Sequence, residues 1–189
     1  MPRKTNTHDL SRESIMQTAR AEFVKKGFQQ VSMRGIAKLL GCSHGAIYYH
    51  FKNKAELFYG IVEADFSSLN QQLEEIATGS EAKLDKLQSI LTRFIEFGLN
   101  NQSQYEMMFM LRNTEVDSLS QTAANKSYQN FAETVQSLSD KRLEIKDIWS
   151  AFIALHGFVS HYHGYVENYE AAQSAAESHV RFVVRGLTG

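Results

Sequence analysis

The stretch GCSHGAIYYHFKNKAELF, which begins at Gly41, combines small residues with hydrogen-bonding aromatic residues in a short helical pattern. Ser43 is placed to cap the helix, and Gly45 lies in the first turn, where nothing bulky would block a close approach. One turn later the sequence carries Tyr48, Tyr49 and His50. Hydroxyl and imidazole groups donate hydrogen bonds to phosphates, and a helix N-terminus favours an anion. The chemistry predicted here is binding to a polyanion.

The charge distribution supports this prediction. Residues 1–54 hold ten Lys and Arg against three Asp and Glu, a net charge of +7, and residues 55–189 carry −8. A basic N-terminal quarter on an acidic body is typical of a protein that meets nucleic acid at one end.

Three helices position these residues. The first is predicted from Ser11 to about Lys26, where Gly27 stops it, and the second follows Ser32 and ends at Gly41. The third covers 44–50. Two helices joined by a short glycine-containing turn form a helix-turn-helix, in which the start of the second helix meets base edges in the major groove.

The rest of the chain also has helical periodicity. Asn53 and Glu56 resemble a capping box that opens a fourth helix, and Ser103 with Glu106 and Ser118 with Gln121 suggest two more helix starts. An eighth helix is predicted over about 146–168 and a ninth over about 170–187. We predict an all-α fold of about nine helices, with a DNA-binding domain over 1–52 and a larger helical domain over 53–189.

The run SMRGIAKLLGCSHGAIYYHFKNKAELF resembles the DNA-binding domain of the TetR family of bacterial transcriptional regulators. The resemblance covers residues 11–62 and implies a homodimer that binds a palindromic operator, with helices eight and nine forming the dimer interface. By this resemblance, Ser32 and Arg34 approach phosphates; Ser43, His44, Gly45 and Tyr49 lie on the recognition helix; Tyr48, His50 and Lys54 clamp the backbone. Packing of Tyr48 in the core and a capping role for His50 are the alternatives.

The larger domain is rich in aromatic and Met residues, which suit an adaptable apolar ligand cavity. The resemblance there is weaker and includes the segments SQYEMMF and IWSAFIALHGFVSHYHGY. The candidate ligand-binding residues are Phe94, Tyr105, Met108, Phe131, Trp149, Phe152, His156 and Tyr162. The alternative is that the same residues fill a solid core and that no ligand exists. Residues 149–162 contain no Lys, Arg, Asp or Glu, so a highly charged ligand is disfavoured.

Other function classes lack support in the sequence. The histidines at 156, 161, 163 and 179 have no spacing that favours a metal, and no nucleophile–base set, phosphate loop or carboxylate pair is visible. We therefore expect neither an enzyme, nor a cofactor, nor a metal site. A single cysteine and the absence of a long apolar run or a signal-peptide pattern favour a cytoplasmic protein and no membrane contact.

The function predicted is a dimeric repressor that leaves its operator when it binds a hydrophobic or aromatic effector. One alternative is an activator, or a regulator that responds to a protein partner without an inducer. A nonspecific architectural DNA-binding module is another, which a single defined palindrome would exclude.

Overall fold

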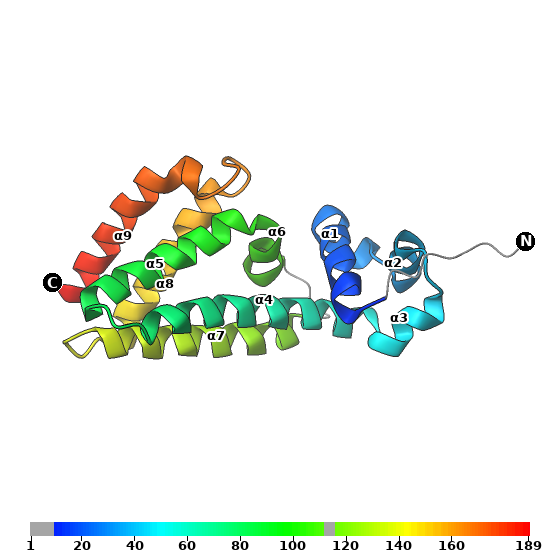
Figure 1. Ribbon diagram of the computed structural model, residues 1–189, viewed down its shortest axis with the longest axis horizontal. Coiled ribbons are helices and arrows are strands. Elements are labelled where there is room, and N and C mark those ends of the chain that lie inside the picture. Colours follow the sequence, from blue (N-terminus) through cyan, green and yellow to red (C-terminus); the bar gives the residue numbers. More distant parts are fainter. Residues whose placement is uncertain (1–9, 112–115) are drawn as a thin grey trace, which may run out of the picture.

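The computed structural model describes residues 10–111 and 116–189, with the backbone alone at 117–119. Within these residues the fold is all-α, with nine α-helices and no strand, as predicted (Figure 1). The helices are α1 (Arg12–Gln30), α2 (Met33–Leu40), α3 (His44–His50), α4 (Lys54–Ala77), α5 (Lys83–Asn100), α6 (Gln102–Tyr105), α7 (Asp117–Leu138), α8 (Ile145–Tyr162) and α9 (Gln173–Thr188). A π-helical turn, η1 (Glu106–Met110), continues α6, and a 3-10 turn, η2 (Glu170–Ala172), precedes α9.

The first three helices begin and end where capping residues predict. Ser11 and Ser14 form a capping box at the start of α1, and Gly27, with φ of 74°, kinks that helix near its predicted end. Ser32 caps α2, and Gly41 ends it in the left-handed conformation with φ of 65°. Glycine reaches this region without the steric cost that a Cβ imposes.

The N-terminal core extends into α4. Phe23 of α1 and Phe58 of α4 are buried, with ring centres 5.1 Å apart, and Phe28 lies 5.4 Å from Phe58. The predicted domain boundary between residues 52 and 53 falls at Asn53, which caps α4. The first turns of α4 therefore complete the core of the domain that precedes this boundary.

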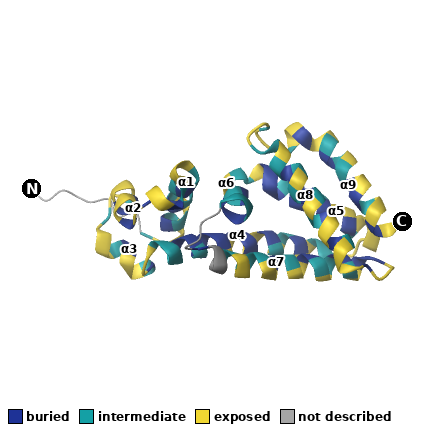
Figure 2. Cartoon of the chain, turned by 180° about the vertical axis from the view of Figure 1, so that it is seen from behind, coloured by how far each residue is buried: buried dark blue, intermediate teal, exposed yellow. Residues whose placement is uncertain are grey.

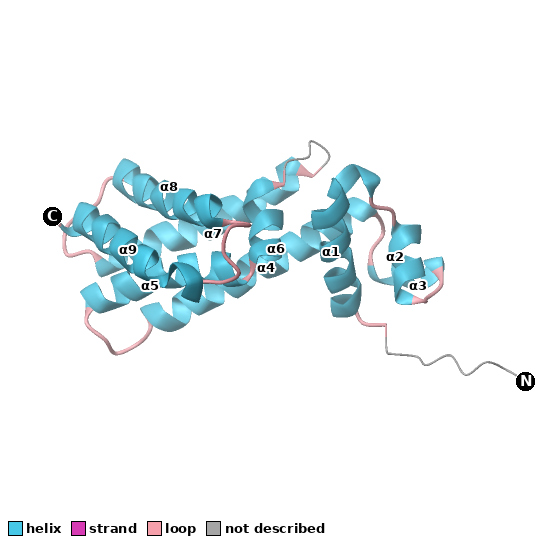
Figure 3. Ribbon diagram, turned by 90° about the horizontal axis from the view of Figure 1, so that it is seen from above, coloured by secondary structure: helices cyan, strands magenta, loops and turns pink. Residues whose placement is uncertain are grey.

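α4 runs from the three N-terminal helices into the larger helical body, where it packs against α5 and α7 (Figure 1). Its inward residues are buried along much of its length (Figure 2). α8 and α9 pack on each other and on α5, at the end of the molecule away from α1–α3 (Figure 3). α4 thus runs from the N-terminal helices into the body, and α1 adds contacts with α6 and η1.

Two predicted helices differ from the structure. α6 begins at Gln102 after Asn101, which makes no side-chain cap, so the predicted cap at Ser103 is wrong. α8 ends at Tyr162, because Gly164 turns the chain with φ of 77°. α7 begins at Asp117, and the side chain of Ser118 lies outside the described residues. No helix in the described part of the chain is long and apolar enough to cross a membrane.

Candidate nucleic-acid interface and effector region

Two serines fix the starts of α2 and α3. Ser32 Oγ accepts a hydrogen bond of 3.1 Å from the Gly35 amide, and Ser43 Oγ accepts one of 3.2 Å from the Ala46 amide. A hydroxyl that accepts a hydrogen bond can still donate its own proton. Both exposed serines can therefore cap a helix and donate to a phosphate at the same time.

α3 has one buried face and one exposed face. Ile47 and the following Phe51 are fully buried and hold the helix against the domain. Tyr49 points away from them and is 87% exposed, and Tyr48 is 43% exposed. Tyr48 is therefore largely a surface residue, and its ring packs edge-on against His44 at 4.6 Å. The side chains on the exposed face are free to reach another molecule.

Gly45 has no packing reason to be glycine. A Cβ at this position would meet nothing within 4 Å, and the backbone is helical. Glycine inside a helix costs roughly 0.5–1 kcal/mol relative to alanine. A residue that weakens the helix without relieving any contact within the protein favours close approach by something outside it.

The end of α3 is held by a residue that the sequence did not single out. Arg12 of α1 donates a hydrogen bond of 3.1 Å to the carbonyl oxygen of His50, and its guanidinium lies 4.1 Å from the centre of the Phe51 ring. The ring of half-buried His50 packs against Tyr49 at 5.3 Å. The basic charge of α1 thus partly serves to orient the recognition helix.

Five predicted DNA-binding residues line one open depression beside α3. They are Ser32, Arg34, His44, Tyr48 and Lys54. Arg34 is exposed, whereas Lys54 is half-buried and donates a 2.7 Å hydrogen bond to the carbonyl oxygen of Phe28. The structure brings the proposed phosphate contacts and the start of α3 onto a single surface.

The predicted effector residues gather in part. The rings of Phe94, Phe131 and Phe152 lie 5.6–6.1 Å from one another and line a void of about 10 Å³. Such a void holds about one water molecule at most. The sequence reasoning missed Phe109, whose ring contacts Phe94, Tyr105, Phe152 and His156. This aromatic cluster is closed in the present structure.

A polar pair lies at one side of the aromatic cluster. The Tyr105 hydroxyl and His156 Nδ1 are 2.6 Å apart, and Ser160 Oγ lies 3.4 Å from His156 Nε2. Burial raises the pKa of Tyr105, so this hydroxyl keeps its proton, and the tautomer of His156 decides which of the two groups donates. A polar atom on an otherwise apolar ligand would take the place of one of these contacts.

Three predicted effector residues lie apart from this centre. Trp149 stacks on Phe152 at 5.6 Å but is 48% exposed. Tyr162 packs against Phe158, whose ring also stacks on His179 of α9. Met108 is buried in η1. The eight predicted residues therefore do not form one cavity.

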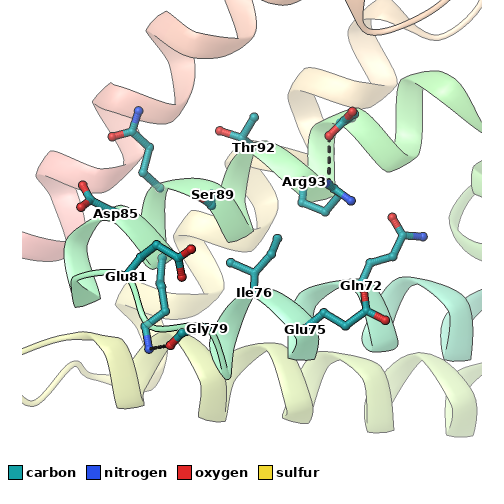
Figure 4. A pocket seen from close by; sticks show the side chains of 12 residues that line it. Gln72, Glu75, Ile76, Gly79, Glu81, Asp85, Ser89, Thr92 and Arg93 are labelled. Atoms are coloured by element: carbon teal, nitrogen blue, oxygen red, sulfur yellow. Dashed lines mark hydrogen bonds and ion pairs between the residues drawn. The ribbon is translucent and has the colours of Figure 1, made fainter.

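A more spacious surface hollow lies elsewhere. A groove of about 660 Å³ runs between α4 and α5, and Glu75, Glu81 and Asp85 line it (Figure 4). Lys86 donates to the carbonyl of Gly79, and Arg93 pairs with Glu96 at 2.9 Å. This groove is polar and open, so it differs from the apolar effector region that the sequence predicts.

α8 and α9 each carry large apolar side chains that are exposed. The exposed residues are Ile145, Trp149 and Ile153 of α8 and Phe182 of α9, which is 68% exposed. Phe182 also lines a groove of about 510 Å³ between the two helices, together with Ala151 and Ala154 of α8. Apolar residues at a spacing of four along one helix form a stripe that another helix can cover.

The fold and the exposed surface around α3 define a helix-turn-helix DNA-binding transcriptional regulator. The family model of bacterial regulatory proteins of the tetR family matches residues 15–60, which contain the helix-turn-helix. Residues 15–60 are therefore similar to the DNA-binding domain of TetR family proteins, and the match supports a TetR family transcriptional regulator.

Relatives with known names agree with this assignment. The chain is similar to the HTH-type transcriptional regulator AcrR of Shigella flexneri, with 27% identity over 181 residues that cover 89% of this chain and 83% of AcrR. A Staphylococcus aureus regulator is 28% identical over 93 residues, about half of either chain.

Solved structures share the whole fold. FadR from Bacillus subtilis in complex with stearoyl-CoA superposes with a TM-score of 0.77 at 15% identity, over 93% of this chain and 99% of FadR. PfmR from Thermus thermophilus, a TetR family regulator, superposes with a TM-score of 0.71 at 18% identity, over 95% and 98% of the two chains.

Proposed function

We propose that the protein is a dimeric repressor, which leaves a palindromic operator when a mainly hydrophobic or aromatic small molecule enters the aromatic cluster of α5–α8. The observation that carries the effector proposal is the Tyr105–His156 pair, a polar contact of 2.6 Å between a fully buried tyrosine and a half-buried histidine on the edge of an otherwise aromatic interior. Apolar pockets with a few placed polar groups are the usual form of small-molecule sites.

The outer face of α8 and α9 supports the dimer. Two copies that bury this face about a twofold axis would form a four-helix bundle. Each copy would then present its α3, and two recognition helices about one DNA turn apart, roughly 34 Å, read the two halves of a palindrome. A bound operator that overlaps a promoter would block transcription.

Release from the operator requires the aromatic cluster to open and admit the effector, because its void of about 10 Å³ holds no organic ligand. The effector would displace side chains such as Phe109 and Phe131 and shift the helices that carry them. α4 joins this region to the DNA-binding helices, so it is the element through which such a shift alters the spacing of the two α3 helices. A coupling of about 1–3 kcal/mol changes DNA affinity roughly 5- to 150-fold.

The closed cluster also favours the second candidate, a regulator or activator that answers to a protein partner and has no small-molecule inducer. Thermal unfolding distinguishes the two. The compounds tested are stearate, stearoyl-CoA and 1-naphthol. ATP is the control, because it is a polyanion without a hydrocarbon chain. Stearate and stearoyl-CoA are included because the structure of FadR from B. subtilis was solved in complex with stearoyl-CoA.

The proposal expects stearate or 1-naphthol to raise Tm and to release the protein from an operator selected in vitro. A ligand at 100 times its Kd stabilises by about 2.7 kcal/mol. His156→Ala should weaken this response, and Ser67→Ala on the exposed side of α4 should keep it. Stabilisation by ATP alone would exclude the apolar effector, and no response to any compound would favour the second candidate.

A further inference from the structure

One buried carboxylate joins the DNA-binding end to the helical body. Asp65 of α4 is 2% exposed. Arg20 of α1 donates to it twice, from Nε to Oδ2 at 3.2 Å and from Nη2 to Oδ1 at 2.5 Å. Gln104 of α6 donates from Nε2 to Oδ1 at 3.0 Å. Three elements that are 39 or more residues apart therefore meet at one side chain.

The carboxylate depends on all three hydrogen bonds. Burial raises the pKa of Asp65, while the hydrogen bond from Gln104 and the charge of Arg20 lower it. A buried charge that loses a partner is destabilised far more than an exposed one. If Gln104 moves away, the remaining contact with Arg20 must adjust or weaken.

α6 holds a second anchor that faces the aromatic cluster. Tyr105, the neighbour of Gln104, is fully buried, and its hydroxyl meets His156 of α8 at 2.6 Å. α6 spans only four residues and continues directly into η1, so its two consecutive side chains move together. A shift of α6 that separates Tyr105 from His156 also pulls Gln104 from Asp65.

We infer that Asp65 and Gln104 are positioning residues for DNA binding: they transmit the state of the Tyr105–His156 contact to α1 through Arg20. α1 in turn orients α3, because Arg12 holds the His50 carbonyl at 3.1 Å. The inference rests on the proposed function for its biological input, an effector near His156. The contacts of Asp65 with Arg20 and Gln104, called the junction below, also make a prediction that needs no effector.

The experiment is a double-mutant cycle on operator affinity in the full chain. Tyr105→Phe removes the hydroxyl that meets His156, and Gln104→Met removes the amide that meets Asp65 while keeping both charges of the ion pair. Asp65→Asn is less suitable, because a broken buried ion pair can prevent folding. Gln88→Met, on the exposed side of α5, is the matched control. The probe is a duplex that wild-type protein selects from a random pool.

The inference predicts that Tyr105→Phe changes operator affinity in the wild-type background. In the Gln104→Met background the same substitution should have an effect on affinity that is smaller by a factor of at least about three, as for residues in one hydrogen-bond network. Gln104→Met should also speed amide hydrogen exchange in α1 of the free protein, and Gln88→Met should not. The inference would be overturned if the two substitutions changed operator affinity by independent factors and left hydrogen exchange in α1 unchanged.

The cycle separates failure of this inference from failure of the proposed function. If no compound releases the protein from its operator, the effector proposal fails, and the cycle still decides the junction. If wild-type protein selects no duplex, the operator proposal fails, and hydrogen exchange in α1 alone tests the inference about Asp65 and Gln104. Faster exchange in Gln104→Met supports the inference, and unchanged exchange overturns it.

Discussion

Lys54 Nζ lies 2.7 Å from the carbonyl oxygen of Phe28 and 4.2 Å from the centre of the Phe28 ring. The side chain predicted to clamp DNA thus also ties α4 to the end of α1. Lys54→Met should lower the free energy of unfolding by about 1–2 kcal/mol, through the lost charged hydrogen bond and the cation–π contact. Urea unfolding of the purified chain measures this change.

The matched control is Lys52→Met, an exposed lysine two residues earlier, which should leave stability within about 0.5 kcal/mol of wild type. Operator binding tests the second role of Lys54. If Nζ also reaches a phosphate, Lys54→Met lowers the slope of log affinity against log salt by about 1. An unchanged slope would confine Lys54 to the internal contact, and unchanged stability would refute that contact.

Gly45→Ala should stabilise the protein and weaken its binding to DNA. Nothing lies within 4 Å of the added Cβ, so the gain in stability is about 0.5–1 kcal/mol. The methyl group would instead meet the DNA surface. Ser67→Ala, an exposed change on α4, is a control that should keep operator affinity. Tighter or equal DNA binding by Gly45→Ala would show that α3 does not approach DNA closely at this point.

Phe182→Glu should convert the proposed dimer to a monomer. The side chain is 68% exposed in one copy, and a carboxylate in a buried apolar interface has no partner. Sedimentation equilibrium measures the change. Leu84→Glu on α5, where the leucine is 53% exposed outside the α8–α9 face, should leave the dimer intact. A dimer that survives Phe182→Glu would place the interface elsewhere.

Tyr105 should make stability fall at alkaline pH. Burial raises its pKa above the ordinary value of 10.0, so above that pH the unfolded chain releases the proton and the folded chain keeps it. Unfolding is then favoured by up to about 1.4 kcal/mol for each further pH unit. Tyr105→Phe removes this term, so its stability should fall less steeply between about pH 9.5 and 11. Parallel pH profiles for the two proteins would contradict the assignment, and exposed Tyr165→Phe is the control.

Local signals predicted the DNA-binding end well. Ser43, Gly41 and Asn53 sit at helix boundaries because capping and left-handed turns depend on residues only a few positions apart. The end of α8 was harder to predict, because Tyr165, Val166 and Tyr169 continue the helical pattern of apolar residues beyond the turn at Gly164. The roles proposed for the DNA-binding residues stay predictions.

Long-range contacts could not be read from the sequence. Tyr105 and His156 both looked like effector residues, but 51 positions separate the two atoms that pair. Asp65 gave no signal at all, because a carboxylate in an amphipathic helix usually faces water. Its burial and its contact with Arg20 follow only from how α1, α4 and α6 pack together.

The central claim is that α3 reads DNA, and one comparison of two exposed tyrosines tests it most directly. Tyr49 is 87% exposed on α3, and Tyr165 is 86% exposed in the connection between α8 and α9. Duplex selection from a random pool, followed by affinity measurement, is run on wild type, Tyr49→Ala and Tyr165→Ala. We predict that wild type and Tyr165→Ala select the same inverted repeat. Tyr49→Ala should bind it about tenfold or more weakly, with unchanged circular dichroism and dimerisation. Wild-type affinity of Tyr49→Ala for the same repeat would contradict the account.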